Sequence, residues 1–201
     1  MKDISEAYYV IGIEIFCERS QWLIGLSQKT YINKVLERLR MDKYSASFVP
    51  IQKGDKFSLL QCPKNDLEQK QMENIPYASV IESLMYAQTW TRSDISFVVG
   101  MLGRYQSNIR LDHWKTAKKV LRYLQETKDH MLTYRRYNHL EVIEYTNLDF
   151  TGCMDTRKST FGYVYLLAGG AISWKSTKQW VVVASTMEVE FVAWFWYHIL
   201  G

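Results

Sequence analysis

Proline, cysteine and long apolar runs are all scarce in this chain. Its 201 residues include only 3 Pro and 10 Gly, which leaves little room for an extended disordered region. The 3 Cys show no paired spacing, so the sequence indicates neither a disulfide framework nor a zinc cluster. No apolar stretch approaches the roughly 18 residues of a membrane span, and the N-terminus lacks a signal-peptide pattern. We therefore expect an intracellular chain without a membrane partner. The sequence does not distinguish the cytoplasm from the nucleus as its compartment.

Histidines with metal-site spacing are also lacking, and the charge is unevenly divided. Residues 138–201 hold four Lys and Arg against six Asp and Glu, which gives them a net charge of −2. Since the whole chain has a net charge of +4, residues 1–137 have a net charge of +6. A basic front part beside an acidic back part suits a polyanion-binding platform next to a carboxylate-rich metal site. It equally suits ordinary solvated surfaces.

What the chain does have is enough apolar material for a core, with 47% hydrophobic residues. In the front part, alternation predicts two strands, at 7–16 and 21–27, around a polar turn. A helix with apolar residues at helical spacing follows over 28–41, with Ser27 as its cap. The polar segment 42–74 reads as a long connection with one short helix near Asp66–Met72.

Three further helices are predicted in the front part, over 77–90, 93–106 and 111–129, the second with Ser93 or Asp94 as its cap. The last has two unlike faces, because four apolar residues recur on one side and four basic residues gather on the other. The apolar face is Trp114, Ala117, Leu121 and Leu124, and the basic stripe is Lys115, Lys118, Lys119 and Arg122. Such a stripe is either a solvated surface or a row of phosphate contacts, which act by counterion release.

From residue 139 onward the period changes to that of strands, with runs at 141–147, 162–168, 171–176 and 180–185 and a hairpin turn at Gly169-Gly170. A helix over 185–200 follows. An Asp on the first strand and a Glu near the start of this helix can bring two carboxylates together at a sheet edge. Divalent metal sites need several such groups, and the candidates here are Asp149 and Glu190.

The strings "IPYASVIESLMYAQTW", "TRKSTFGYV", "GGAISWKS" and "STMEVEF" closely resemble the end of the Pol polyprotein of copia-type LTR retrotransposons. This resemblance covers nearly the whole chain. It implies an α+β fold in which residues 1–137 form the late palm, thumb and connection of a reverse transcriptase. Residues 138–201 would form a truncated RNase H-like domain, an incomplete mixed sheet with one helix.

The resemblance also implies which activities to expect. The polymerase carboxylates of the family lie upstream of the matching segment, so we expect no polymerase activity from this chain alone. The family's RNase H cuts the RNA strand of RNA–DNA hybrids with Mg²⁺ or Mn²⁺. Its leading Asp falls on Asn147, its second Asp on Asp149 and its helix Glu on Glu190.

Because an amide lacks the charge that a hard cation selects, Asn147 argues against a working metal site. The sequence therefore favours a retrotransposon-derived fragment without catalytic activity that needs no cofactor. Binding of an RNA–DNA or DNA duplex through the basic stripe stays open. The alternative is an RNase H that is active only in a longer chain or with a complementing Pol chain.

Overall fold

The structure, a computed structural model, describes residues 8–41, 44–52, 57, 70, 73–137, 139–149 and 159–178, with only the backbone at 148–149. These residues form an α+β fold of two antiparallel sheets and four α-helices, which confirms the predicted class. The strand predicted at 180–185 and the helix predicted at 185–200 lie outside the described residues. So does nearly all of the segment that holds the short helix predicted near Asp66–Met72.

The first sheet has the order β1-β2-β3-β4 and is antiparallel throughout. Its central hairpin, β2 (Ile13–Glu18) and β3 (Leu23–Ser27) around the 3₁₀ turn η1 (Arg19–Gln21), confirms the predicted pair of strands. The strand predicted over 7–16 is nevertheless interrupted. Ile11 and Gly12 have φ of 49° and 73°, so β1 (Tyr9–Val10) folds back onto β2 in a tight turn that Gly12 favours.

The fourth strand of this sheet comes from a distant part of the sequence. β4 (Leu132–Arg135) pairs with β3, with Leu23 opposite Arg135 and Leu26 opposite Leu132. It follows the last helix of the front part, and the sequence pattern did not indicate it, because four residues are too short to show alternation.

The helices are α1 (Lys29–Arg38), α3 (Tyr77–Trp90), α4 (Ser96–Leu102) and α5 (Leu111–Glu126). The cap predicted at Ser27 is wrong by one residue, because Gln28 occupies the N-cap position of α1 and makes no side-chain cap bond. The Ser27 hydroxyl, one residue earlier, accepts a hydrogen bond from the Lys29 N–H at 3.2 Å. The cap predicted at Ser93 or Asp94 is wrong, since these residues lie within the 3₁₀ turn η4 (Ser93–Ile95) and α4 has no side-chain cap. None of the described helices is long and apolar enough to cross a membrane.

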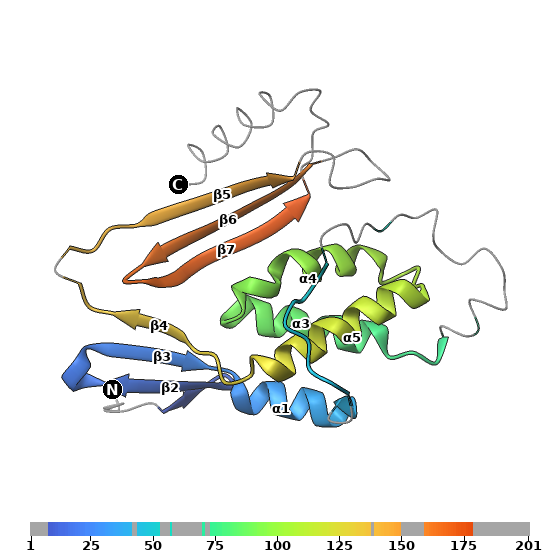
Figure 1. The fold of residues 1–201 in the computed structure, drawn as a ribbon, viewed down its shortest axis with the longest axis horizontal. Coiled ribbons are helices and arrows are strands. Elements are labelled where there is room, and N and C mark those ends of the chain that lie inside the picture. The colour runs from blue at the N-terminus through green and yellow to red at the C-terminus, as the bar shows by residue number, and fades with distance from the viewer. Residues whose placement is uncertain are drawn as a thin grey trace, which may run out of the picture.

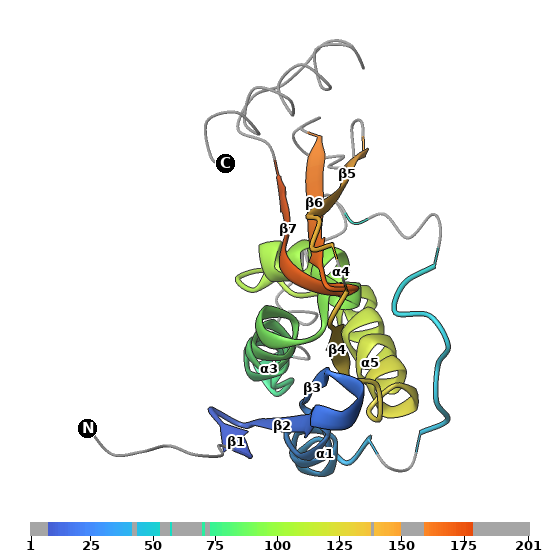
Figure 2. The same ribbon diagram turned by 90° about the vertical axis from the view of Figure 1, so that its left-hand side faces the viewer.

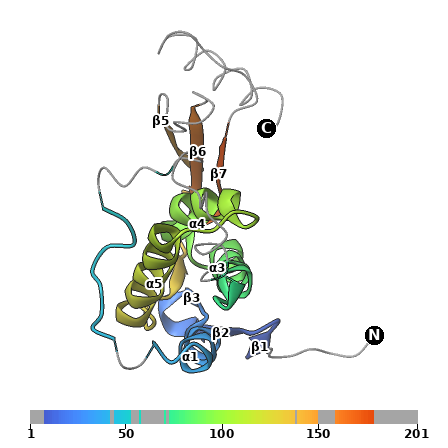
Figure 3. The same ribbon diagram turned by 90° about the vertical axis from the view of Figure 1, so that its right-hand side faces the viewer.

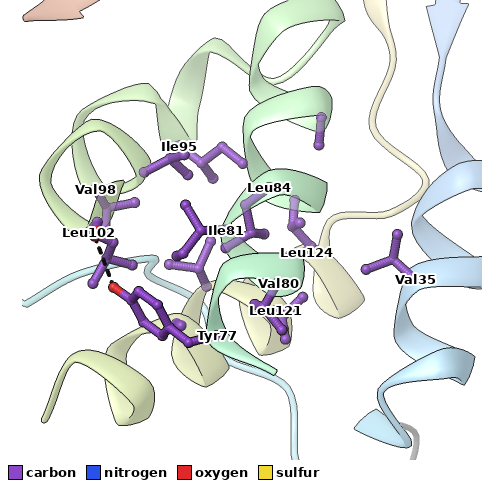
Figure 4. Close-up of a cluster of buried hydrophobic side chains, with 14 of the residues drawn as sticks. Val35, Tyr77, Val80, Ile81, Leu84, Ile95, Val98, Leu102, Leu121 and Leu124 are labelled. Carbon is purple, nitrogen blue, oxygen red and sulfur yellow. Dashed lines mark hydrogen bonds between the residues drawn. The ribbon is translucent and has the colours of Figure 1, made fainter. Parts of the chain in front are cut away.

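The hydrophobic core lies where α1, α3, α4 and α5 meet (Figure 4). It is built from side chains at helical spacing, as the periodicity predicts. Tyr77 is completely buried, and its hydroxyl donates to the Leu102 carbonyl at 2.9 Å, which satisfies a backbone acceptor at the end of α4. The other fully buried apolar side chains are Val80, Ile81, Leu84, Ile95, Val99, Leu102, Ala117, Val120 and Leu121.

The second sheet has the order β5-β6-β7, with β5 (Ile143–Asp149), β6 (Thr160–Leu167) and β7 (Gly170–Lys178) all antiparallel. Asn147 pairs with Gly162 and Asp149 with Thr160. The predicted hairpin is confirmed with its turn one residue earlier. Ala168 and Gly169, with φ of 53° and 78°, form the turn.

Side chains and backbone groups join this sheet to the rest of the protein. In Figures 1 and 2 it stands at one end of the helices, with β7 beside α4. The Trp174 indole N–H donates to the Gln88 carbonyl of α3 at 2.8 Å, and Arg104 contacts the Thr160 hydroxyl at 3.4 Å. The Arg135 N–H donates to the Ala168 carbonyl at 2.9 Å, so β4, a strand of the first sheet, also contacts the second sheet.

Candidate nucleic-acid and metal site

Asn147 and Asp149 lie near the end of β5, one of the two outer strands of the second sheet among the described residues. They are two residues apart on this strand, and they pair with Gly162 and Thr160 of β6. Asn147 is exposed. The register fixes the backbone positions of the two residues, and the predicted placement of the Asp149 side chain stays a prediction. Asp149 cannot take the place of Asn147 without a slip in the register with β6, where Asn147 faces Gly162.

The residues that the structure describes do not test the predicted metal ligands. Among these residues, no three His, Cys, Asp or Glu side chains lie close enough to hold a metal ion. Glu190 lies outside the described residues, and the Asp149 side chain is not described. The exposed Asn147 amide supplies one neutral oxygen, whereas Mg²⁺ is held mainly by carboxylates. Asp149 and Glu190 as metal ligands remain predictions.

A cavity of about 240 Å³ adjoins Asn147. It lies where the beginning of α4 approaches the β5–β7 sheet, and two exposed aromatic residues line it, Phe97 from α4 and Tyr145 from β5. Neither residue stands out in the sequence, because an aromatic residue on a helix or strand is usually part of a core. The full lining is Ser96, Phe97, Tyr145, Thr146, Asn147, Thr160, Gly162, Tyr163, Val164, Lys175 and Ser176.

The basic stripe lies on α5, opposite the residues that enter the core. Ala117, Leu121 and Leu124 are buried as predicted. Among the basic residues, the Lys115 side chain is 69% exposed and pairs with Asp112 at 3.4 Å, while Lys119 is half-buried and has no ion pair with a described residue. Helical spacing puts all four basic residues on one side of α5.

Arg122 differs from the lysines because its guanidinium is held by another segment of the chain. Its Nε donates to the Ser45 carbonyl, and its Nη2 donates to the Ser45 hydroxyl at 2.8 Å. The Ser47 N–H in turn donates to the Arg122 carbonyl at 3.2 Å. Figure 3 shows residues 44–52, in cyan, beside α5. Arg122 therefore anchors this segment, and its donors are less free for phosphate than those of the lysines.

Lys118 also has intramolecular neighbours, but these leave its charge available. Its ammonium lies 5.8 Å from the centre of the Tyr44 ring and 5.6 Å from that of Trp114. Such cation–π contacts hold the ammonium in place without neutralising it. The surface thus presents Lys115, Lys118 and Lys119 as cations, with two aromatic rings beside them.

Several known proteins are similar to this chain over nearly all of its length. It is 38% identical over 193 residues to the "Retrovirus-related Pol polyprotein from transposon TNT 1-94" of Nicotiana tabacum, a match that covers 96% of this chain and 14% of that protein. It is 32% identical over 191 residues to the corresponding polyprotein of transposon RE2 of Arabidopsis thaliana, which covers 95% of this chain and 12% of that protein. No family model and no solved structure matches.

A shorter relative carries a different description. The chain is 38% identical over 122 residues to "Secreted RxLR effector protein 161" of Plasmopara viticola, which covers 61% of this chain and 86% of that protein. The matches to transposon proteins are longer and more numerous. The chain belongs to the Pol polyproteins of copia-type LTR retrotransposons. It spans only about a seventh of the length of TNT 1-94 and about an eighth of that of RE2.

Proposed function

We propose that this retrotransposon-derived Pol segment binds nucleic-acid duplex through Lys115, Lys118 and Lys119 of α5 and has no catalytic activity of its own. The observation that carries the proposal is the arrangement of these three ammonium groups on one side of α5, opposite its core-facing residues. Among the described residues, Asp112 forms an ion pair with one of these three lysines, Lys115. A row of cations on a straight helix suits the evenly spaced phosphates of a duplex backbone.

The domain assignment belongs to the same proposal. Residues 1–137 correspond to the late palm, thumb and connection of a reverse transcriptase, and residues 138–201 to part of an RNase H-like domain. The family resemblance supports this division, and the antiparallel β5–β7 sheet is compatible with it. In this frame α5 belongs to the part of a reverse transcriptase that would hold the template–primer duplex.

Lack of catalysis follows from the residue at the leading metal position of the RNase H-like part. Asn147 keeps the shape of an Asp but not its charge, and charge is what a divalent metal mainly selects. Without the metal, water and phosphate oxygens would not be brought together for hydrolysis. The segment would then act as a binding module, with affinity set by the number of phosphates it contacts.

The test measures binding of a fluorescently labelled RNA–DNA hybrid and a DNA duplex to the full chain at several salt concentrations. The proposal expects affinity to fall steeply with salt and the slope to decrease by about 1 for each phosphate-contacting Lys replaced by Glu. The variants are Lys119→Glu and the double variant Lys118→Glu/Lys119→Glu. Lys34→Glu is the matched control, because it makes the same charge change on the exposed side of α1.

Two results would overturn the proposal, one for each half. If Lys119→Glu and Lys34→Glu weaken binding equally, net charge rather than the α5 surface is responsible. If the hybrid is cut in Mg²⁺ or Mn²⁺, and the cutting stops in Asn147→Ala, the chain has the catalytic activity that the proposal denies.

A further inference from the structure

The cavity beside Asn147 combines exposed aromatic rings, an open floor at Gly162 and the side-chain amide of Asn147. Phe97 is 40% exposed and Tyr145 60% exposed, although both are large aromatic residues. They come from different elements, α4 and β5, and both line the same 240 Å³ space. Aromatic surface left exposed in a hollow is available to a flat ring that stacks on it.

The floor of the cavity is open because the residue opposite Asn147 is Gly162. Even a Cβ added there would meet nothing closer than the Lys175 carbonyl at 3.6 Å. A flat group can therefore approach the β5–β6 backbone beside the Asn147 amide. Polar hydroxyls line the same space, from Ser96, Thr160 and Ser176.

Alternation along β5 puts Asn147 and Tyr145 on one face of the sheet. This face turns toward the helices, since Trp174, which shares a row with Val164 and Tyr145, donates its indole N–H to the Gln88 carbonyl of α3. The exposed amide and the two aromatic rings thus border one cavity between α4 and the sheet.

We infer that this cavity binds one unpaired nucleobase, with adenine preferred, from a single-stranded stretch of nucleic acid. Aromatic side chains bind unstacked bases through their π-faces, and base edges are then read by hydrogen bonds. An Asn side chain offers one N–H donor and one C=O acceptor side by side. Adenine presents the complementary pair, the N7 acceptor and the N6 amino donor.

The same reasoning explains why an amide suits this position better than a carboxylate. A carboxylate accepts hydrogen bonds but donates none, so it would meet the N7 acceptor of adenine with a negative charge. Asn147 therefore serves a neutral base where Asp would serve a cation. The inference rests on the proposed function in one respect, that nucleic acid is the ligand, but it concerns a different surface from the α5 lysines.

The experiment uses the full chain and labelled single strands of six adenines, six cytosines or six thymines, with adenosine monophosphate as competitor. The inference expects the adenine strand to bind most tightly. Phe97→Ala should weaken that binding by roughly five- to a hundredfold, the range for loss of one stacking partner. Asn147→Ala should weaken it by a similar factor, the range for loss of one bidentate contact to a base. Phe48→Ala is the control, because Phe48 is 82% exposed and does not line the cavity. Circular dichroism checks that each variant is folded.

Competition by adenosine monophosphate separates the free nucleotide from the strand as the ligand. If the mononucleotide binds as tightly as the six-adenine strand, the cavity takes a free nucleotide and the assignment to single strands is wrong. If either cavity variant leaves binding of the adenine strand within about twofold of wild type, the base site itself is wrong.

Failure of this inference is distinguishable from failure of the proposed function. Duplex binding that depends on Lys119, together with strand binding that ignores Phe97 and Asn147, overturns the base site alone. Adenine binding that depends on Phe97 without any duplex binding overturns the α5 surface alone. The Asn147→Asp variant adds a sharper check, because it should lose the preference for adenine while keeping both aromatic rings.

Discussion

The guanidinium of Arg92 and the carboxylate of Asp94 form a doubly hydrogen-bonded ion pair, with Nε–Oδ1 at 3.0 Å and Nη2–Oδ2 at 2.7 Å. The Arg92 side chain is only 5% exposed. Arg92 also donates to the carbonyl and hydroxyl of Thr127, and the Tyr123 hydroxyl donates to Asp94 at 2.7 Å. This network joins the end of α5 to the turn between α3 and α4.

Breaking this pair should be costly, because the remaining charge would stay away from water. We expect Asp94→Asn to lower the free energy of unfolding by about 3 kcal/mol, measured by urea denaturation at pH 7. Lys29→Met is the control, since the Lys29–Asp129 pair at 2.6 Å has side chains that are 51% and 62% exposed. It should change stability little. Equal losses of unfolding free energy in the two variants would mean that burial of the Arg92–Asp94 pair does not add to its contribution to stability.

The Arg92–Asp94 pair also predicts a loss of stability in acid. Burial alone would raise the pKa of Asp94, but the hydrogen bonds and positive charge of Arg92 outweigh this effect and lower it below the usual 3.8. The ionised carboxylate therefore stabilises the folded state above about pH 4, and this contribution is lost as the pH falls through the lower folded pKa. Urea denaturation from pH 5 to pH 2 should show a smaller acid-induced loss in Asp94→Asn than in wild type.

His113 predicts a second pH dependence, closer to neutrality. It is fully buried, stacks on Tyr105 with ring centres 4.3 Å apart, and its Nδ1 accepts the Arg110 N–H at 3.2 Å. Burial lowers the pKa of His113 below 6.5, with Asp112 opposing this effect and Arg110 adding to it. The unfolded state then binds more protons than the folded state, so stability falls as the pH drops below about 6.5.

The measurement is the free energy of unfolding at pH 7.5, 6.5 and 5.5 in wild type and in His113→Phe. The Phe variant keeps an aromatic ring beside Tyr105 and cannot be protonated. We expect its stability to change less between these pH values than that of wild type. The same slope in both proteins would show that His113 does not titrate in this range.

Gly170 is placed where a side chain cannot fit. A Cβ added there would lie 2.5 Å from the Thr133 carbonyl oxygen and 2.7 Å from the Tyr134 ring. Because the Thr133 carbonyl is backbone, β4 would have to move away from β7. We expect Gly170→Ala to cost about 2 kcal/mol and to speed hydrogen exchange at the Arg135 amide, which donates to Ala168.

Gly162→Ala is the matched control for this change. It lies in the same hairpin, but its added Cβ would find ordinary contacts, 3.6 Å from the Lys175 carbonyl and 3.9 Å from the Asn147 carbonyl. Its stability should stay within about 0.5 kcal/mol of wild type. If both variants lose the same stability, the cost comes from replacing glycine in a strand and not from the contact with β4.

How much of this fold the sequence predicts depends on the range of the interactions that decide each element. The helix 77–90 was predicted with the residues at which α3 begins and ends, because its apolar spacing and the preceding Pro76 are local signals. The cap at Asp94 was predicted wrongly. Its carboxylate is bound to Arg92 and Tyr123, and Tyr123 is 29 residues away along the chain. Local pattern contains no information on such contacts.

The candidate site shows the same limit. Asn147 was recognised from the family pattern, and the lysine stripe from helical spacing. Phe97 and Tyr145 were not, since only the packing of α4 against the second sheet brings residues 48 positions apart to one cavity. Helical position alone groups Arg122 with the lysines, whereas its bonds to Ser45 depend on where the connection 44–52 runs.

Arg122 and Lys119 should therefore respond differently to the same loss of charge. Arg122→Gln removes the donors that hold Ser45, so limited proteolysis within residues 44–52 should become faster and stability should fall by about 1–2 kcal/mol. Lys119→Gln makes the same change in charge at a residue with no ion pair to a described residue. It should leave proteolysis unchanged and weaken duplex binding.

The two measurements are made on the same preparations, so that folding and binding are compared directly. Duplex binding at low salt is read by fluorescence anisotropy, and cleavage of residues 44–52 by mass spectrometry. Arg122→Gln should weaken duplex binding less than Lys119→Gln, because its guanidinium is already bonded to Ser45. Equal proteolysis rates in the two variants would contradict the anchoring role of Arg122. A larger loss of duplex binding in Arg122→Gln than in Lys119→Gln would show that Arg122 contacts phosphate as the lysines do.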